Sequence, residues 1–306
     1  MVASNDSLES VNKWQSPPED LMKVLNAPKL PSVWTSPTGN HMLLLDPILY
    51  PPLADLAAPM HKLAGIRLNP KNNFYQSWHE ATNPRLIRIN DGKTIPIDIP
   101  ANSEIVGVSW NVDGKRFALS IKYPNHIGLM IVTVEGVVKR IEGIALNKLM
   151  SSAVSWLPDQ ERLLIRRIPI RGAAPEPPVI PVGPKVLEGA GASARSTYEA
   201  RNLLETAYHD ALFDYYTKSE LVILDPGTGK MNVIGKPAHY TSAQFSPDGS
   251  YILVKRLVKP WSHEVTYRRF ASETEVWNKK GELVSRIATL PVADQVPVRG
   301  VPLGPR

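Results

Sequence analysis

The stretch SAQFSPDGSYILVKR, from Ser242 to Arg256, has a polar tight-turn core, Ser-Pro-Asp-Gly, with an apolar residue before it and the run Tyr-Ile-Leu-Val after it. Proline fixes the φ angle that a tight turn needs at its second position, and glycine adopts a positive φ without steric cost. The stretch is therefore typical of a β-hairpin. Whether it stands alone or recurs decides the fold.

The hairpin pattern occurs four times along the chain. In each copy an apolar or aromatic residue enters a turn of Pro, Asp, Asn or Gly, and an apolar strand follows. The other copies are VWTSPTGNHMLLLD (Val33–Asp46), VSWNVDGKRFALSI (Val108–Ile121) and VSWLPDQERLLIRR (Val154–Arg167). The third of these has Gln160 where the other copies have a glycine, at Gly39, Gly114 and Gly249. Because glycine tolerates a positive φ best, this difference predicts a looser third turn.

A second kind of hairpin follows each copy. It is a strand, a Gly-containing turn and another strand, in RLIRINDGKTIPI (Arg85–Ile97), LMIVTVEGVVKRI (Leu129–Ile141), LVILDPGTGKMNVI (Leu221–Ile234) and TEVWNKKGELVSRI (Thr274–Ile287). The repeating unit thus has four strands, and its most compact copy, Val108–Ile141, fits within the roughly 40–45 residues of a propeller blade. Four such units in series predict an all-β fold, a β-propeller that forms an incomplete ring. A β-sandwich is the alternative, but a sandwich has no reason to repeat the same turn chemistry.

Long insertions between the hairpins define the expected domain organisation. We expect an N-terminal extension over residues 1–30 and a partial β-propeller domain over residues 31–306. The insertions fall at about 47–83, which is rich in Pro and Asn, and at about 168–219, which opens with a Pro- and Gly-rich extended segment.

Two helices are predicted outside the repeats. Prolines flank residues 18–26, which predicts a short helix in the N-terminal extension. In STYEARNLLETAYHDALFDYY, residues 196–216, apolar residues recur at helical spacing: Leu203, Leu204, Ala207, Ala211 and Leu212. Ser196 or Thr197 is expected to cap this second helix.

Composition excludes several classes of protein. The chain has 306 residues, of which 43% are hydrophobic, and no cysteine, so it has no disulfide framework, thiolate metal site or cysteine nucleophile. No apolar run approaches the roughly 18 residues of a membrane helix, and the first residues do not resemble a secretory signal. The net charge is +6, but the basic residues are scattered rather than clustered. We therefore expect a solvated basic surface, with neither nucleic acid nor a membrane as partner.

Motifs that superficially suggest chemistry do not hold up. GASAR, residues 191–195, resembles the start of a nucleophile elbow, but Arg195 replaces the small residue that the tight turn needs. DPGTGK, residues 225–230, lacks the first glycine and the Ser/Thr of a phosphate loop, so a hairpin turn is expected. The pair His209-Asp210 is expected to face solvent on the predicted helix. No cofactor, no metal site and no catalytic residue is predicted, and substrate-contacting residues are not identifiable.

Several stretches resemble the glutamyl endopeptidase branch of the prolyl oligopeptidase family. They are PPLADLAAPMHKLAGIRLNP (Pro51–Pro70), IPVGPKVLEG (Ile180–Gly189), LLETAYHDALFDYYTKSELV (Leu203–Val222) and ATLPVADQVPVRGVPLGPR (Ala288–Arg306). The resemblance covers nearly the whole chain from about Trp14. The LADLA…KLAG and DALFDYY stretches are specific to this branch, whereas the turns are shared with many propellers.

The resemblance implies a role in peptide hydrolysis. Family members combine an N-terminal β-propeller with a C-terminal α/β-hydrolase domain that carries a Ser–Asp–His triad, and this chain resembles the propeller portion only. We therefore expect a chain that is inactive alone and that gates or positions peptide substrates for a hydrolase domain not present here. The alternatives are a non-catalytic protein-interaction propeller and a truncated remnant without activity. A cytoplasmic location is expected, or the chloroplast stroma if the protein is from a plant.

An incomplete ring has consequences for the end units. Their outer faces are expected to expose apolar residues from two runs, Leu43–Leu45 and Ile252–Val254, so that the chain self-associates or needs a complementary half. The aromatic residues that enter the turns are expected to be buried at equivalent positions: Trp110, Trp156 and Phe245.

Overall fold

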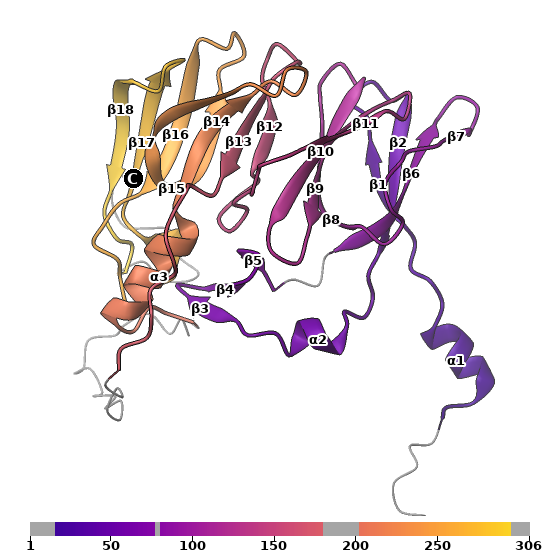
Figure 1. Ribbon diagram of the computed structural model, residues 1–306, viewed down its shortest axis with the longest axis horizontal. Helices are drawn as coiled ribbons and strands as arrows, with labels where there is room; N and C mark the ends of the chain where they lie inside the picture. The colour runs from indigo at the N-terminus through magenta and orange to yellow at the C-terminus, as the bar shows by residue number, and fades with distance from the viewer. Residues whose placement is uncertain (1–15, 77–79, 180–201, 295–306) are drawn as a thin grey trace, which may run out of the picture.

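The strands form an eight-stranded, a seven-stranded and a three-stranded antiparallel sheet in the computed structural model, which describes residues 16–76, 80–179 and 202–294 (Figure 1). We divide the two large sheets into four consecutive units. Unit 1 contains β1 (Ser32–Thr35), β2 (His41–Pro47), β6 (Ala81–Arg88) and β7 (Thr94–Ile95). Unit 2 contains β8 (Glu104–Trp110), β9 (Arg116–Lys122), β10 (Ile127–Thr133) and β11 (Val138–Ile141). Unit 3 contains β12 (Val154–Trp156), β13 (Leu163–Arg167), β14 (Ser219–Leu224) and the start of β15 (Met231–Phe245). Unit 4 contains the rest of β15, β16 (Tyr251–Leu257), β17 (Ser272–Asn278) and β18 (Leu283–Leu290).

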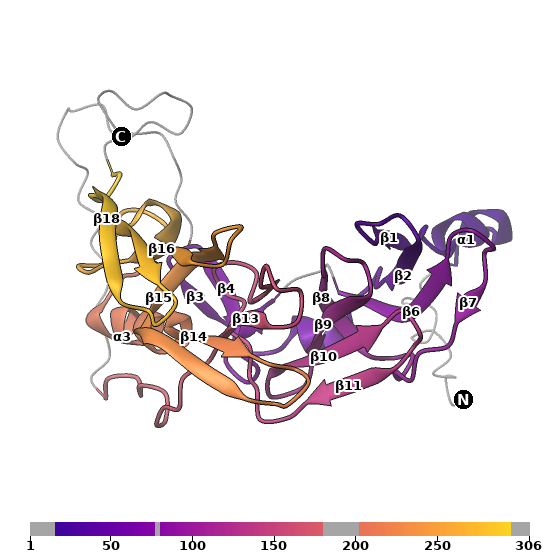
Figure 2. The same ribbon diagram turned by 90° about the horizontal axis from the view of Figure 1, so that it is seen from above.

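All eight predicted hairpins are present. The first hairpin of every unit has the same register, because the residue before the turn pairs with the residue seven positions later: Thr35 with Met42, Trp110 with Phe117, Trp156 with Leu163, and Phe245 with Ile252. Viewed from above, the units follow one another from unit 1 at the right to unit 4 at the left (Figure 2). The predicted all-β, propeller-type fold is confirmed.

The third turn is not looser than the others, and that prediction is wrong. Gln160 has a φ of 62°, close to the 72°, 69° and 67° of Gly39, Gly114 and Gly249. Its backbone N–H donates to Leu157 at 2.9 Å, the same turn bond that Gly39 donates to Ser36 at 2.9 Å. Contacts from unit 2, described below, offset the cost of a positive φ at a residue with a side chain.

The core consists of separate apolar layers between neighbouring units. Successive residues of a strand point to opposite faces, so each central strand contributes to two layers. On β9, Phe117 and Leu119 face unit 1, whereas Ala118 faces unit 3. On β13, Leu163 and Ile165 face unit 2, whereas Leu164 faces unit 4. The units therefore stack face to face, as propeller blades do.

The runs expected on the outer faces are divided by the same alternation. Leu43, Leu45, Ile252 and Val254 are buried against the neighbouring unit of this chain. Leu253, at 45% exposure, points the other way. Two of the three residues in each run are thus buried by a neighbouring unit of the same chain and are not exposed on an outer face.

The three aromatic residues that enter the turns are half-buried, not buried as predicted. Two of them use their polar edge to join neighbouring units. The Trp110 indole N–H donates to the Trp34 carbonyl of unit 1 at 3.1 Å, and the Trp156 indole N–H donates to the Ser109 carbonyl of unit 2 at 2.9 Å. Trp34 and Ser109 hold equivalent positions, two residues before their turns. The side chain of Phe245 has no N–H group, so unit 4 cannot form this bond.

The long connections between the second and third strands gather at one end of the units (Figure 1). The first carries α2 (Leu53–Leu56) and the small sheet β3 (His61–Leu63), β4 (Ile66–Asn69) and β5 (Phe74–Tyr75). The second carries α3 (Ala207–Thr217), and a third, in unit 4, carries the 3-10 turn η1 (Tyr267–Arg269). These three connections share one apolar cluster that includes Leu68, Phe213 and Trp261. The sequence predicted neither this common cluster nor the contribution of unit 4. We call this the insertion end and the opposite one the turn end.

The predicted helices are present with changed bounds. Helix α1 (Glu19–Leu25) lies within residues 18–26 as expected. Helix α3 begins only at Ala207, where the Thr206 side chain accepts a bond from the His209 N–H at 3.2 Å. Leu203 and Leu204 therefore precede the helix instead of forming its apolar face. The predicted caps Ser196 and Thr197 lie outside the described residues.

Candidate functional site

A cavity of about 570 Å³ lies at the insertion end, between the first long connection and unit 2. Much of its wall is apolar and comes from Leu56, Met60, Tyr75 and Tyr123, together with several prolines. Its size is within the range of ligand pockets, which run from about 300 to 1,000 Å³. Residues far apart in the sequence build it, because the connection folds back over the end of β9.

Lys122 forms the polar centre of this cavity. Its Nζ lies 2.7 Å from a Glu104 carboxylate oxygen, 3.3 Å from one of Glu80 and 3.5 Å from one of Asp55. Burial alone would lower the pKa of Lys122, but the bond to Glu104 and the charges of the three carboxylates raise it. Three carboxylates surround one ammonium, so this centre favours positive charge.

The lining of the cavity is typical of a binding site. A mostly apolar wall with a few convergent charges is the form of a site that recognises a peptide or another small ligand. In the described part of the chain, no group of three or more histidines and carboxylates is arranged to hold a metal ion.

A second arrangement superficially resembles a catalytic triad. His239 Nε2 lies 3.3 Å from Asp214 Oδ1, and His239 Nδ1 lies 2.9 Å from Thr217 Oγ1. Thr217 is 1% exposed, however, and its hydroxyl donates to the Phe213 carbonyl at 2.6 Å. A buried hydroxyl that no substrate can reach is not a nucleophile, so this group joins α3 to β15.

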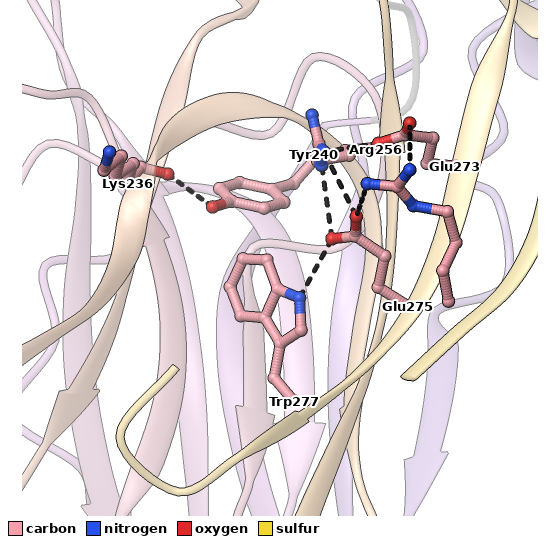
Figure 3. A network of polar contacts seen from close by, with 7 residues as sticks. Lys236, Tyr240, Arg256, Glu273, Glu275 and Trp277 are labelled. Atoms are coloured by element: carbon pink, nitrogen blue, oxygen red, sulfur yellow. Dashed lines mark hydrogen bonds and ion pairs between the residues drawn. The ribbon is translucent and has the colours of Figure 1, made fainter. Parts of the chain in front are cut away.

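In a third charged group, in unit 4, the charged side chains pair with one another (Figure 3). Glu275 is 3% exposed and accepts bonds from Arg256 at 3.1 and 3.3 Å and from the Trp277 indole at 2.9 Å. Arg286 lies 3.3 Å from Glu275 and 3.4 Å from Glu273. Burial would raise the pKa of Glu275, but the bonds from Arg256 and Trp277 lower it. Each charge has a partner, so the group stabilises the sheet and presents no free site.

The motifs weighed in the sequence fall outside this cavity. DPGTGK forms the turn between β14 and β15, where Asp225 accepts bonds from the Gly227 and Thr228 N–H groups at 2.8 and 3.2 Å, so the predicted hairpin turn is confirmed. His209 is half-buried and Asp210 pairs with His263 at 2.9 Å, so the predicted solvent-facing pair is wrong. GASAR lies outside the described residues. The sequence missed the Lys122 centre, because its four charged residues are ordinary surface types in separate segments.

Comparisons with known proteins show which proteins the chain is similar to. No family model matches it. Two plant proteins, each named "probable glutamyl endopeptidase, chloroplastic", match almost all of it: 31% identity over 93% of the chain for the rice protein, and 33% over 97% for the Arabidopsis thaliana protein. The chain is similar in sequence to these two proteins over almost its whole length. The resemblance predicted from the sequence is thus confirmed, although the chain spans only about a third, 32%, of the length of these curated relatives.

Solved structures that resemble this chain are more distant from it in sequence. An acylaminoacyl peptidase from Pyrococcus horikoshii has 14% identity and a TM-score of 0.45, over 86% of this chain and 32% of that one. The β-propeller domain of the Trilobed protease from Pyrococcus furiosus has 12% identity and a TM-score of 0.43, over 85% and 58%. These scores are low, so the fold description rests on the strand pairing of the chain itself.

No helix in the described segments is long and apolar enough to cross a membrane.

Proposed function

We propose that this chain is the propeller portion of a glutamyl endopeptidase-like serine peptidase, and that it gates or positions peptide substrates for a hydrolase domain outside this chain. The observation that carries the proposal is the identity of 31–33% to two proteins named as such, over 93–97% of the chain. The cavity around Lys122 supports a role in binding, because it combines apolar walls with convergent charges.

A chimaera tests the proposal directly. The chain would replace the homologous third of the rice relative, and cleavage of Glu-containing fluorogenic peptides would be measured. We expect the chimaera to cleave and the chain alone not to cleave. The substitution Lys122→Met in the chimaera should raise KM with little change in kcat, because it disturbs binding and not chemistry. Asp91→Asn, in a turn of unit 1, is the matched control.

Two outcomes would overturn the proposal. A chimaera that melts cooperatively but cleaves nothing would show that this propeller cannot serve such a hydrolase. Turnover by the purified chain alone, blocked by a serine-reactive phosphonate, would show that the chain carries its own active site.

Location and self-association are proposed on the sequence. We propose a cytoplasmic location, or the chloroplast stroma if the source is a plant, as the names of the relatives suggest. Self-association remains a prediction, and light scattering at micromolar concentration tests it. A monodisperse monomer would contradict it.

A further inference from the structure

The junction between units 3 and 4 lacks the contacts that close the other junctions at the turn end. Phe245 replaces the tryptophan whose indole bonds the preceding unit, and the Ser155 carbonyl, equivalent to that of Ser109, receives no side-chain donor. No hydrogen bond joins residues 157–162 to residues 244–251, all of which the structure describes. A Cβ at Gly249 would lie 3.8 Å from Pro158, whereas one at Gly114 would lie 2.4 Å from Thr38.

A cavity of about 490 Å³ lies at this junction. Its apolar lining comes from the turn of unit 3 and from β14, β15 and Phe245: Leu157, Ile223, Val233, Ile234 and Phe245. Ile234 and Leu157 are buried and give the cavity an apolar part, whereas Asp159, Arg162 and Asn232 are among its polar lining residues. A cavity that is open to solvent and partly apolar can take a partner's anchoring side chain.

The rim of this seam cavity carries an excess of positive charge. Arg162 is paired with Asp159 at 2.6 Å, and Asp248 accepts a bond from the Ser246 hydroxyl at 2.5 Å. Lys279 and Lys280 also line the cavity, are exposed, and have no ion pair within the described ranges. Two free ammonium groups at the mouth favour carboxylates on the partner.

We propose that the seam cavity binds an aromatic side chain of an acidic peptide segment. The repeat explains why an aromatic group fits: an indole bridges each of the two preceding junctions, and here that indole is missing while a cavity is present. A tryptophan is the best occupant, because its ring fills apolar space and its N–H can donate a hydrogen bond to a polar group of the lining. Flanking carboxylates would pair with Lys279 and Lys280. This site is at the opposite end from the Lys122 cavity and does not depend on the proposed peptidase role.

The test uses the full chain and an Asp-Trp-Glu amide labelled with fluorescein at its N-terminus, followed by polarisation at low salt. We expect saturable binding that weakens at least about tenfold for Asp-Ala-Glu, because an aromatic anchor carries most of the energy of such a contact. The double variant Lys279→Glu and Lys280→Glu should weaken binding about fivefold and reduce its salt dependence. Lys115→Glu, at the turn end of unit 2, is the matched control and should bind normally.

Filling the cavity gives the decisive variant. Phe245→Trp should abolish binding of the peptide while the melting temperature stays the same or rises, because the chain's own indole then occupies the site. Asn232→Arg, exposed on the face of β15 that Ile234 also occupies, should block binding too, and serves if Phe245→Trp does not fold. Unchanged binding in both variants, equal binding of Asp-Ala-Glu, or no binding of Asp-Trp-Glu at millimolar concentration would overturn the proposal.

Discussion

The junctions on the two sides of unit 3 differ at the turn end. At the junction with unit 2, the Trp156 indole reaches Ser109, and the Val112 N–H donates to the Gln160 side chain at 2.6 Å. At the junction with unit 4, no hydrogen bond joins residues 157–162 to residues 244–251. A side-chain bond lies toward the insertion end instead, where Arg166 donates to the Tyr240 carbonyl at 2.6 Å. One repeating unit can therefore be joined to its neighbours in two ways.

The difference explains the conformation of Gln160. In the other three turns a glycine takes the positive φ, but at this position the side chain bonds Val112, and the Gln160 carbonyl accepts a bond from Arg116 at 2.8 Å. These bonds across the junction offset the strain of a positive φ, which is of order 1–3 kcal/mol. A junction with such bonds tolerates a residue that a free turn would disfavour.

The largest expected effect compares the two aromatic residues directly. Trp156→Ala should destabilise the chain by about 3 kcal/mol and Phe245→Ala by about 2 kcal/mol, because the first loses apolar packing and a bond to unit 2, whereas the second loses packing only. Urea unfolding measures both, with Trp34→Ala on the exposed strand β1 as the control. A larger loss for Phe245→Ala would contradict the assignment of the turn-end bonds to the junction of units 2 and 3.

The next effect concerns a buried ammonium beside unit 2. Gly107 leaves the space that Lys148 fills, and burial, with a small contribution from Arg166, lowers the pKa of Lys148 to about 8 from 10.5. The charged form is disfavoured in the fold, so its cost is complete below pH 8 and disappears above 10.5. Lys148→Met should therefore stabilise the chain by about 2 kcal/mol at pH 7.

The pH dependence of that gain is the check. Thermal melts of Lys148→Met and the unsubstituted chain should differ at pH 7 and converge near pH 11. The exposed Lys115→Met should change neither. If Lys148→Met destabilises the chain at pH 7, Lys148 has an anionic partner and the explanation is wrong.

Strong acid should loosen the junction of units 3 and 4. Burial would raise the pKa of Asp214, but bonds from His239, Lys259 and Trp261 lower it to about 2. A depressed carboxylate pKa gives stability that is present above about pH 4 and is lost as the pH falls toward 2. The loss should be about 1–2 kcal/mol, and Asp214→Asn should remove that pH dependence. Equal acid sensitivity in Asp214→Asn and the unsubstituted chain would refute the assignment of this loss of stability to Asp214.

The smallest effect isolates one hydrogen bond. Trp156→Phe keeps a ring in place but removes the N–H that reaches Ser109, so it should cost about 1 kcal/mol. It makes the junction of units 2 and 3 resemble that of units 3 and 4. The denaturant midpoint, compared at constant m-value, measures this loss of stability. An unchanged midpoint would mean that the indole hydrogen bond adds no stability beyond the packing of the ring.

Local chemistry explains why the hairpins could be predicted from the sequence. A Pro-Asp-Gly or Asp-Gly turn fixes the register of its own strands, so the seven-residue spacing follows from residues next to each other in the chain. The same is true of the turn at Asp225, whose side chain bonds residues 227 and 228 and whose backbone bonds residues 229 and 230.

Contacts between distant segments explain what could not be predicted. The Gly65 N–H donates to the Asn202 carbonyl at 2.9 Å, and the Tyr267 N–H donates to that of Ala64 at 2.9 Å, so all three long connections meet. The start of α3 and the charges around Lys122 depend on that meeting. No local sequence pattern predicts this contact between the connections, because each segment taken alone has the composition of an ordinary polar loop.

Strand β15 has a consequence for how cleavage acts on the chain. It runs without a loop from Met231 to Phe245, pairing first with β14 and then with β16. Units 2 and 3 are joined by a loop over residues 142–153, but most of that loop is buried or half-buried, and its Leu146 N–H donates to the Ile127 carbonyl of unit 2 at 2.8 Å. A protease needs backbone that is exposed and free of such bonds. Neither connection offers that, so limited proteolysis should not separate unit 3 from either neighbour at these two connections.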